Sequence, residues 1–283
     1  MEWYWAFAFL LGMIMFMMAI GVPVAFAFLT TNIIGWLYFN GWDMNAILQV
    51  VDNSTILITR FTLGPVPMFI MMGSLFFHTG LATLTGSSMA NTAMLGSLMV
   101  PEMQRRGYNR QMSMGPILGT GGLAMIIPPS ALGVLLASVA SIDVGRLLIA
   151  GLIPGFVLAV LYAGMIAVQL WMKPGSAPAY DVEPTTGRQK IRLVCTNILP
   201  MSFVVFMVIG FIIFGWATPT EAAAIGVFGV MLLAGAFRVL KLNAIFTSVD
   251  GTVRVAAMVF FILMNSTVFS QLLAFSGASK GML

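Results

Sequence analysis

The sequence predicts an all-α, polytopic membrane protein. Of its 283 residues, 60% are hydrophobic and only 8% are charged, whereas a soluble domain carries about 25% charged residues. Apolar runs of about 18 residues or more, long enough to cross a bilayer as a helix, recur along the chain. These runs do not alternate polar with apolar residues, so the pattern favours helices over barrel strands.

Nine apolar segments are expected, and the connections between them carry most of the charge. The segments lie near residues 3–19, 22–39, 66–81, 84–100, 115–140, 147–172, 194–215, 221–237 and 255–275. Basic residues gather in the connections 101–114, 173–193 and 238–254, which two apolar segments separate from one another. All three connections can therefore face one side, which the positive-inside rule makes cytoplasmic. This topology explains the net charge of +4, and we expect no binding to nucleic acid.

One apolar segment is interrupted in its middle by residues that disrupt a helix. It contains the run Gly119, Thr120, Gly121, Gly122 and then Pro128, Pro129, Ser130. The two prolines remove two backbone donors, and the glycines allow the backbone to unwind. We therefore expect unpaired carbonyls near residues 121–125, of the kind that coordinates Na⁺ in secondary transporters, and a following half-helix whose positive end faces an anion. The alternative is a proline kink whose carbonyls are satisfied by serine hydroxyls and water.

The segment 84–100 begins with a polar cluster. This cluster includes Gly86, Ser87, Ser88, Asn91 and Thr92. The apolar part that follows, 93–100, is too short to cross a bilayer, so we interpret the segment as one arm of a re-entrant hairpin. Its hydroxyl, amide and carbonyl oxygens suit a hard cation. The alternative is that Ser87 or Ser88 caps the helix that follows.

Few other residues suggest a catalytic, binding or capping role. Thr218 and Glu221 fit a capping box at a helix start, although Glu221 could also relay protons. We expect His78 to lie at an interface or in packing, and Arg60 either to extend toward the membrane surface or to meet an anionic substrate. We find no nucleophile–base set, phosphate loop or metal motif in the sequence, so we expect no enzyme and no bound cofactor.

Four stretches together resemble the large membrane subunit of the tripartite ATP-independent periplasmic (TRAP) transporters. They are "PVPMFIMMGSLFFHTGLA", "LTGSSMANTAMLGSLMVPEMQRRGYN", "GPILGTGGLAMIIPPSALGVLLASVASIDVGRLLIAGLIPG" and "GWATPTEAAAIGVFGVML". The resemblance implies an elevator-type transporter of inverted repeats in the bacterial inner membrane. It also implies a Na⁺ gradient as the driving force, a small membrane (Q) subunit, and a periplasmic binding protein. The cargo would be a carboxylate, such as a four-carbon dicarboxylate, sialic acid or another sugar acid.

The resemblance also assigns parts of the chain. Residues 86–92 would form the first hairpin tip and 120–130 the first broken helix, which together make a sodium site and half of the substrate cavity. The stretch "TPTEAAA" would open the second repeat and match "GVPVAFAF" in the first. We therefore divide the chain into scaffold helices of the first repeat (1–81), transport elements (82–140), a connecting helix and cytoplasmic loop (141–193), and the start of the second repeat (194–283).

Three departures from the family pattern bear on these expectations. Many members have an aspartate where this chain has Asn91, which changes the charge of the cation site. The family has an additional stretch between Ala82 and Thr83, and a second hairpin and second broken helix that would follow Leu283. We therefore expect the sequence to be incomplete. The alternative function is an ion-coupled anion symporter of a related hairpin-containing superfamily that works without a binding protein.

Overall fold

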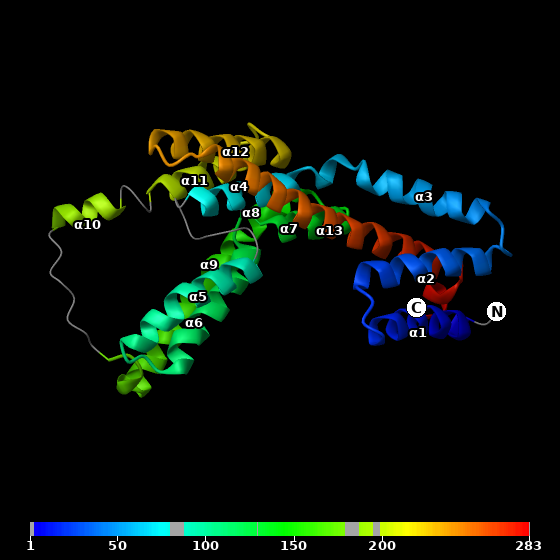
Figure 1. Ribbon diagram of the computed structural model, residues 1–283, viewed down its shortest axis with the longest axis horizontal. Helices are drawn as coiled ribbons and strands as arrows, with labels where there is room; N and C mark the ends of the chain where they lie inside the picture. Colours follow the sequence, from blue (N-terminus) through cyan, green and yellow to red (C-terminus); the bar gives the residue numbers. More distant parts are fainter. Residues whose placement is uncertain (1–2, 80–87, 129, 179–186, 195–198, 283) are drawn as a thin grey trace. The chain divides into compact units, whose positions relative to one another are not determined.

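The computed structural model describes residues 3–79, 88–128, 130–178, 187–194 and 199–282, and these residues form helices and no strand. The longer helices are α1 (Trp3–Ala19), α2 (Val24–Phe39), α3 (Asn45–Ile58), α4 (Pro65–Thr79), α5 (Ser88–Arg105), α6 (Arg110–Ile126), α9 (Leu152–Met172), α11 (Leu199–Ile213), α12 (Pro219–Ala236) and α13 (Leu242–Phe275). The shorter elements are η1 (Phe61–Leu63), α7 (Ala131–Val139), α8 (Val144–Ala150), η2 (Pro174–Ser176), α10 (Gly187–Leu193) and α14 (Ala278–Met282). The all-α prediction is confirmed (Figure 1).

Three helical stretches in the described part of the chain are long and apolar enough to cross a membrane. They are Val144–Met172, which joins α8 and α9, Pro219–Ala236 and Leu242–Phe275. Shorter apolar helices cover Trp3–Ala19, Val24–Phe39, Ile47–Ile58, Pro65–Leu75 and Ser202–Ile213. Their number and composition agree with a protein that enters the membrane several times.

Several expected boundaries are wrong, for one physical reason. The sequence prediction ended each element where charge begins, but helical backbone bonds continue through charged residues. Thus α5 runs past Val100 to Arg105, and α13 begins at Leu242 rather than near residue 255, so most of the expected connection 238–254 is helical. Helix α3 was not expected, because its polar residues interrupt the apolar run.

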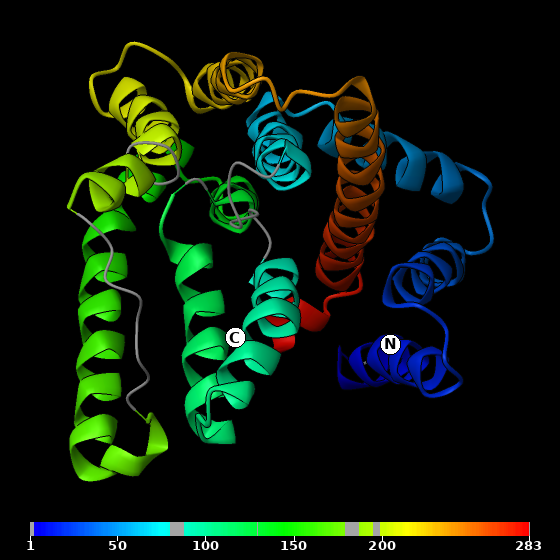
Figure 2. The same ribbon diagram turned by 60° about the vertical axis from the view of Figure 1, so that its left-hand side comes forward.

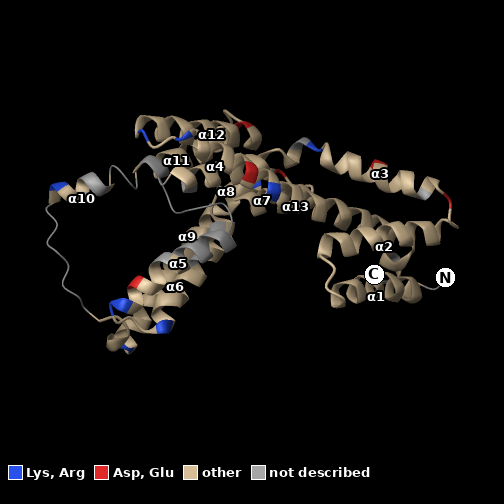
Figure 3. Cartoon of the chain, viewed as in Figure 1, with Lys and Arg blue, Asp and Glu red and all other residues tan. Residues whose placement is uncertain are grey.

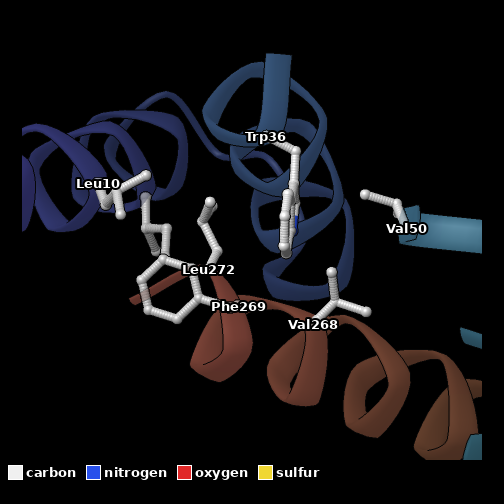
Figure 4. Close-up of a cluster of buried hydrophobic side chains, with 7 residues drawn as sticks. Leu10, Trp36, Val50, Val268, Phe269 and Leu272 are labelled. Carbon is white, nitrogen blue, oxygen red and sulfur yellow. The ribbon is translucent and has the colours of Figure 1, made fainter. Parts of the chain in front are cut away.

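The chain forms two compact units, residues 1–61 with 254–283 and residues 62–253. The first unit is held by a hydrophobic cluster from α1, α2, α3 and α13 (Figure 4). Its buried members are Leu10, Ile14, Trp36, Val50, Val268, Phe269 and Leu272. Trp36 also stacks on Phe275, with ring centroids 5.1 Å apart. This division into two units differs from the four functional segments predicted from the sequence, and those segments stay a prediction.

In the second unit, α12 packs on both α4 and α11. Gly226 makes the close approach in this packing, since a Cβ there would lie 2.7 Å from both Met72 Sδ and Val208 Cγ2. Helix α7 packs on α4 and α8. The buried Ser138 of α7 donates a hydrogen bond of 2.7 Å to Thr62 Oγ1, which ties α7 to the entry of α4.

Helices α5 and α6 form an antiparallel hairpin, and α6 also packs on α9 (Figures 1 and 2). The turn depends on Gly107, whose φ of +85° suits glycine. The Tyr108 N–H closes the turn by donating to the Met103 carbonyl at 3.0 Å. Asn109 then caps α6, because its side chain accepts from the Gln111 N–H at 3.3 Å.

Candidate ion and substrate site

The helix break predicted at the two prolines is present. Helix α6 ends at Ile126 and α7 begins at Ala131. Ile127 is extended, with φ −80° and ψ 122°. Since Pro128 has no N–H, the Ala124 carbonyl cannot receive its helical hydrogen bond. Pro129 lies outside the described residues.

The glycine cluster does not unwind the helix, which corrects the sequence interpretation. Gly119, Gly121 and Gly122 all lie inside α6, and the Ile127 N–H still donates to the Leu123 carbonyl at 3.0 Å. Glycine permits unwinding but does not force it. Gly119 instead makes room for α9, because a Cβ there would lie 2.9 Å from the Tyr162 ring. The carbonyls left without helical partners are therefore limited to the last turn of α6.

Ser130 serves both sides of the break. Its buried hydroxyl accepts from the Gly133 N–H at 3.0 Å, which caps α7, and donates to the Met125 carbonyl at 2.6 Å. The second bond satisfies a carbonyl whose helical partner would be the N–H that Pro129 lacks. The alternative interpretation was a proline kink whose freed carbonyls are satisfied by serine hydroxyls and water. At Met125 a serine hydroxyl does satisfy the carbonyl.

The end of α6 is fixed against the junction of α8 and α9. A Cβ at Gly151 would lie 2.7 Å from the Ile126 carbonyl oxygen, and one at Gly155 would lie 2.5 Å from Ile127 Cγ1. Both glycines allow a close approach that any other residue would obstruct. The sequence prediction missed them, because the contact joins segments 25 or more residues apart.

The predicted hairpin tip is described in part. Ser88 is the first residue of α5, and Asn91 and Thr92 lie in its first turns. The side chains of these three residues and of Thr120 are outside the described part of the structure, as are Gly86, Ser87 and the junction of Ala82 with Thr83. Ser88 is already the first helical residue of α5, and the capping alternative at Ser87 stays a prediction.

The hairpin brings the start of α5 and the end of α6 to one end. At 1.5 Å per residue the two antiparallel helices are nearly equal, about 27 Å for α5 and about 26 Å for α6, and a turn of four residues joins them at the other end. From these lengths, Ser88 at the start of α5 is expected near the level of Ile126 at the end of α6. The polar start of α5 shares this end with the last turn of α6, in which the Ala124 carbonyl has no helical partner. The sequence prediction placed these two parts together.

The capping box at the start of α12 is confirmed. The Glu221 N–H donates to Thr218 Oγ1 at 3.4 Å, and Glu221 Oε2 accepts from the Thr218 N–H at 2.7 Å. The same carboxylate oxygen accepts from the Thr218 hydroxyl at 2.8 Å. The geometry therefore accounts for Glu221 as a cap, and a proton-relay role is not needed to explain its position.

His78 links α4 to α13. Its Nδ1 lies 2.8 Å from the Ser74 carbonyl, which can only accept, so Nδ1 carries the proton in this contact. Ser248 Oγ lies 3.2 Å from the same nitrogen. This agrees with the packing role expected for His78. Ser248 was not singled out, because no local pattern relates it to a residue 170 positions away.

Comparison with known families decides the identity. The family model described as "Tripartite ATP-independent periplasmic transporter, DctM component" matches residues 79–282. The chain belongs to this family. The matched region begins at the last residue of α4, so it contains both the α5–α6 hairpin and the α6–α7 break. The resemblance to the TRAP large subunit is confirmed.

Three individual relatives named as TRAP large permeases show the extent of the similarity. The chain is 25% identical to the C4-dicarboxylate TRAP transporter large permease protein DctM of Rhodobacter capsulatus, over 96% of the chain and 70% of that protein. It is 26% identical to the DctM protein of Vibrio cholerae, over 78% of the chain and 54% of that protein. It is also 26% identical to the ectoine TRAP transporter large permease protein TeaC of Halomonas elongata, over 94% of the chain and 68% of that protein.

The chain thus spans between 54% and 70% of the length of these TRAP permeases. The alignment with the Rhodobacter capsulatus protein runs over 321 residues, more than the 283 of this chain. That permease therefore has residues within the aligned region that this chain lacks, which agrees with an absent internal stretch. The placement of that stretch between Ala82 and Thr83 stays a prediction.

Proposed function

We propose that the chain is the large membrane subunit of a Na⁺-driven TRAP transporter that imports an organic acid anion across the bacterial inner membrane. The observation that carries the proposal is the shared end of the α5–α6 hairpin. Both the last turn of α6 and the polar start of α5 belong to this end of the hairpin, in a chain of the DctM family.

The sodium site is proposed at this shared end. The Ala124 carbonyl lacks a helical donor because residue 128 is proline, and carbonyls at the C-terminal end of a half-helix attract a cation. Ser88, Asn91 and Thr92 would add hydroxyl and amide oxygens from the first turns of α5. Oxygen ligands of this kind suit a hard cation such as Na⁺.

The cargo is proposed to be a carboxylate. Helix α7 starts at the same break, and its positive end favours an anion. The relatives' names include C4-dicarboxylate, ectoine and 2,3-diketo-L-gulonate as substrates, and each of these compounds carries a carboxylate. Sialic acid stays open as a further member of this class. A small membrane subunit and a periplasmic binding protein are the proposed partners.

The proposed pair of repeats is supported by an internal sequence match. Helix α4 contains "FIMMGSLFF" (69–77) and α13 contains "FILMNSTVF" (261–269), with identical residues at five of nine positions. In the second unit α4 packs on α12, and in the first unit α13 contacts α2 through Asn32 and the Phe28–Phe269 ring pair. Thus α4 of the proposed first repeat packs on α12 of the second, and α13 of the second repeat contacts α2 of the first.

The proposal is tested by uptake into proteoliposomes that contain the large and small subunits. With the cognate binding protein outside, we expect radiolabelled carboxylate to accumulate only under an inward Na⁺ gradient. Ser88→Ala and Asn91→Ala should raise the Na⁺ concentration needed for half-maximal uptake at unchanged protein level. Ser113→Ala is the matched control, because Ser113 lies on α6 at the other end of the hairpin and its hydroxyl bonds to its own helix.

Two outcomes would overturn parts of the proposal. Uptake that needs no Na⁺ gradient would refute the coupling. Uptake that needs the gradient but no binding protein would favour the alternative of an independent ion-coupled symporter.

A further inference from the structure

The end of α9 marks the level of one membrane surface. Val144–Met172 is one of the stretches long and apolar enough to span the bilayer. Its last residues, Trp171 and Met172, are 83% and 71% exposed, and the basic Lys173 follows them directly. A tryptophan followed by a lysine at the end of a span is typical of the interface between acyl chains and headgroups.

The turn of the α5–α6 hairpin lies at this same level. The Asn109 N–H donates to the Ser176 carbonyl at 2.9 Å, directly beyond the end of α9. Gly107 also approaches Pro178, since a Cβ on the glycine would lie 3.1 Å from Pro178 Cγ. Two contacts from different residues therefore fix the turn beside the segment that follows Lys173.

This placement gathers positive charge at the membrane surface. Arg105, Arg106, Arg110 and Lys173 are exposed around the joined turns, and we call them the basic rim. In the cartoon of Figure 3, ribbon coloured for Lys and Arg lies at this end of the hairpin. Among the described residues of the joined turns one is acidic, Glu102, which accepts a hydrogen bond of 2.8 Å from Arg106 Nε, so these described residues carry an excess of positive charge.

We infer that the basic rim binds the headgroups of anionic phospholipids and so fastens the α5–α6 turn to the end of α9. Arginine side chains present paired N–H donors that match phosphate oxygens. A lipid fits better than a free anion, because α9 also presents an exposed apolar surface for acyl chains, including Val168 and Met165. The inference needs α9 to span the membrane but does not depend on what is transported.

The test is lipid binding by the purified full chain in neutral detergent, measured by native mass spectrometry and by thermal shift. Phosphatidylglycerol is compared with phosphatidylcholine at equal concentration. We expect several-fold more bound phosphatidylglycerol and a higher melting temperature with it than with phosphatidylcholine. The triple change Arg105→Gln, Arg106→Gln and Arg110→Gln should remove most of this preference. Arg238→Gln with Lys241→Gln, in the basic connection before α13, is the matched control and should keep it.

A gain-of-binding variant separates lipid binding from misfolding. Glu102→Gln removes the carboxylate that competes with phosphate for Arg106, so it should increase phosphatidylglycerol binding about two-fold or more. The inference is wrong if the wild-type chain shows no preference between the two lipids, or if Glu102→Gln leaves binding unchanged. It is also wrong if inorganic phosphate reproduces the thermal shift, since the rim would then be a site for a free anion.

Discussion

The side-chain Nδ2 of Asn32 donates a hydrogen bond of 2.8 Å to the backbone carbonyl of Asn265. Both residues are buried, and Asn265 directs its own Nδ2 to the Phe261 carbonyl at 2.8 Å. The bond joins α2 to α13, and its two residues lie 233 positions apart in the sequence. Within the described part of the chain, Asn32 Oδ1 is a buried acceptor without a protein partner. The contact therefore stabilises the helix pair while leaving one polar atom unpaired.

We expect Asn32→Ala to lower the free energy of unfolding by about 1 kcal/mol, the usual contribution of a hydrogen bond between membrane helices. Thr31→Ala is the matched control, because the equally buried Thr31 hydroxyl bonds only to Ala27 of its own helix. Thermal unfolding in detergent, followed by circular dichroism, measures both variants. Equal losses would show that the bond between the helices adds nothing beyond packing.

Ser130 offers a second test, because its two hydrogen bonds can be separated. Glycine caps a helix almost as well as serine, whereas alanine caps poorly and costs about 0.5–2 kcal/mol. If capping of α7 dominates, Ser130→Ala should destabilise the protein more than Ser130→Gly. If the bond to the Met125 carbonyl dominates, both changes should cost the same, because both remove the hydroxyl. Melting temperatures of the two variants distinguish these cases.

Local chemistry explains which features could be predicted from the sequence. Pro128 lacks an N–H wherever the chain folds, so the end of α6 could be located without a structure. The capping box likewise depends on Thr218 and Glu221, three residues apart. Both predictions needed only neighbouring residues, and both are confirmed.

Features that depend on distant residues could not be predicted. From the sequence alone, Gly119 suggests a point where the helix unwinds. In the structure it instead lies against Tyr162 of α9. The same holds for Ser248, which reaches His78 across 170 positions. A single sequence gives the residue type but not the neighbour, so the role of a glycine or a serine stays open until the packing is known. The same is true of Ser88, Asn91 and Thr92, whose side chains are proposed to bind Na⁺, so their roles stay predictions.

Glu221 can be tested for capping against proton relay. Glutamine can also occupy the third position of a capping box, so Glu221→Gln should keep both the stability and the uptake of the wild type. Glu221→Ala removes the acceptor for the Thr218 N–H, and we expect it to lower the melting temperature below that of Glu221→Gln. Thermal unfolding and proteoliposome uptake are measured on the same preparations. A stable Glu221→Gln protein that no longer transports would show that the carboxylate itself is required.

The last prediction concerns the glycines around the break in α6. Gly151→Ala would place a methyl group 2.7 Å from the Ile126 carbonyl oxygen, a backbone atom that can move only if the end of α6 moves. We therefore expect this change to lower both the melting temperature and the uptake. Gly122→Ala meets no atom within 4 Å, and alanine favours a helix over glycine by about 1 kcal/mol. This variant should be as stable as the wild type or more so.

The pair also tests whether the glycine cluster unwinds in function. If α6 stays helical through the transport cycle, Gly122→Ala should transport at the wild-type rate. A Gly122→Ala protein that is fully stable but inactive would instead mean that α6 must unwind at this position during transport, because the change adds no steric contact and removes only backbone freedom. Loss of stability in Gly122→Ala, with Gly151→Ala unaffected, would contradict the packing described for the end of α6.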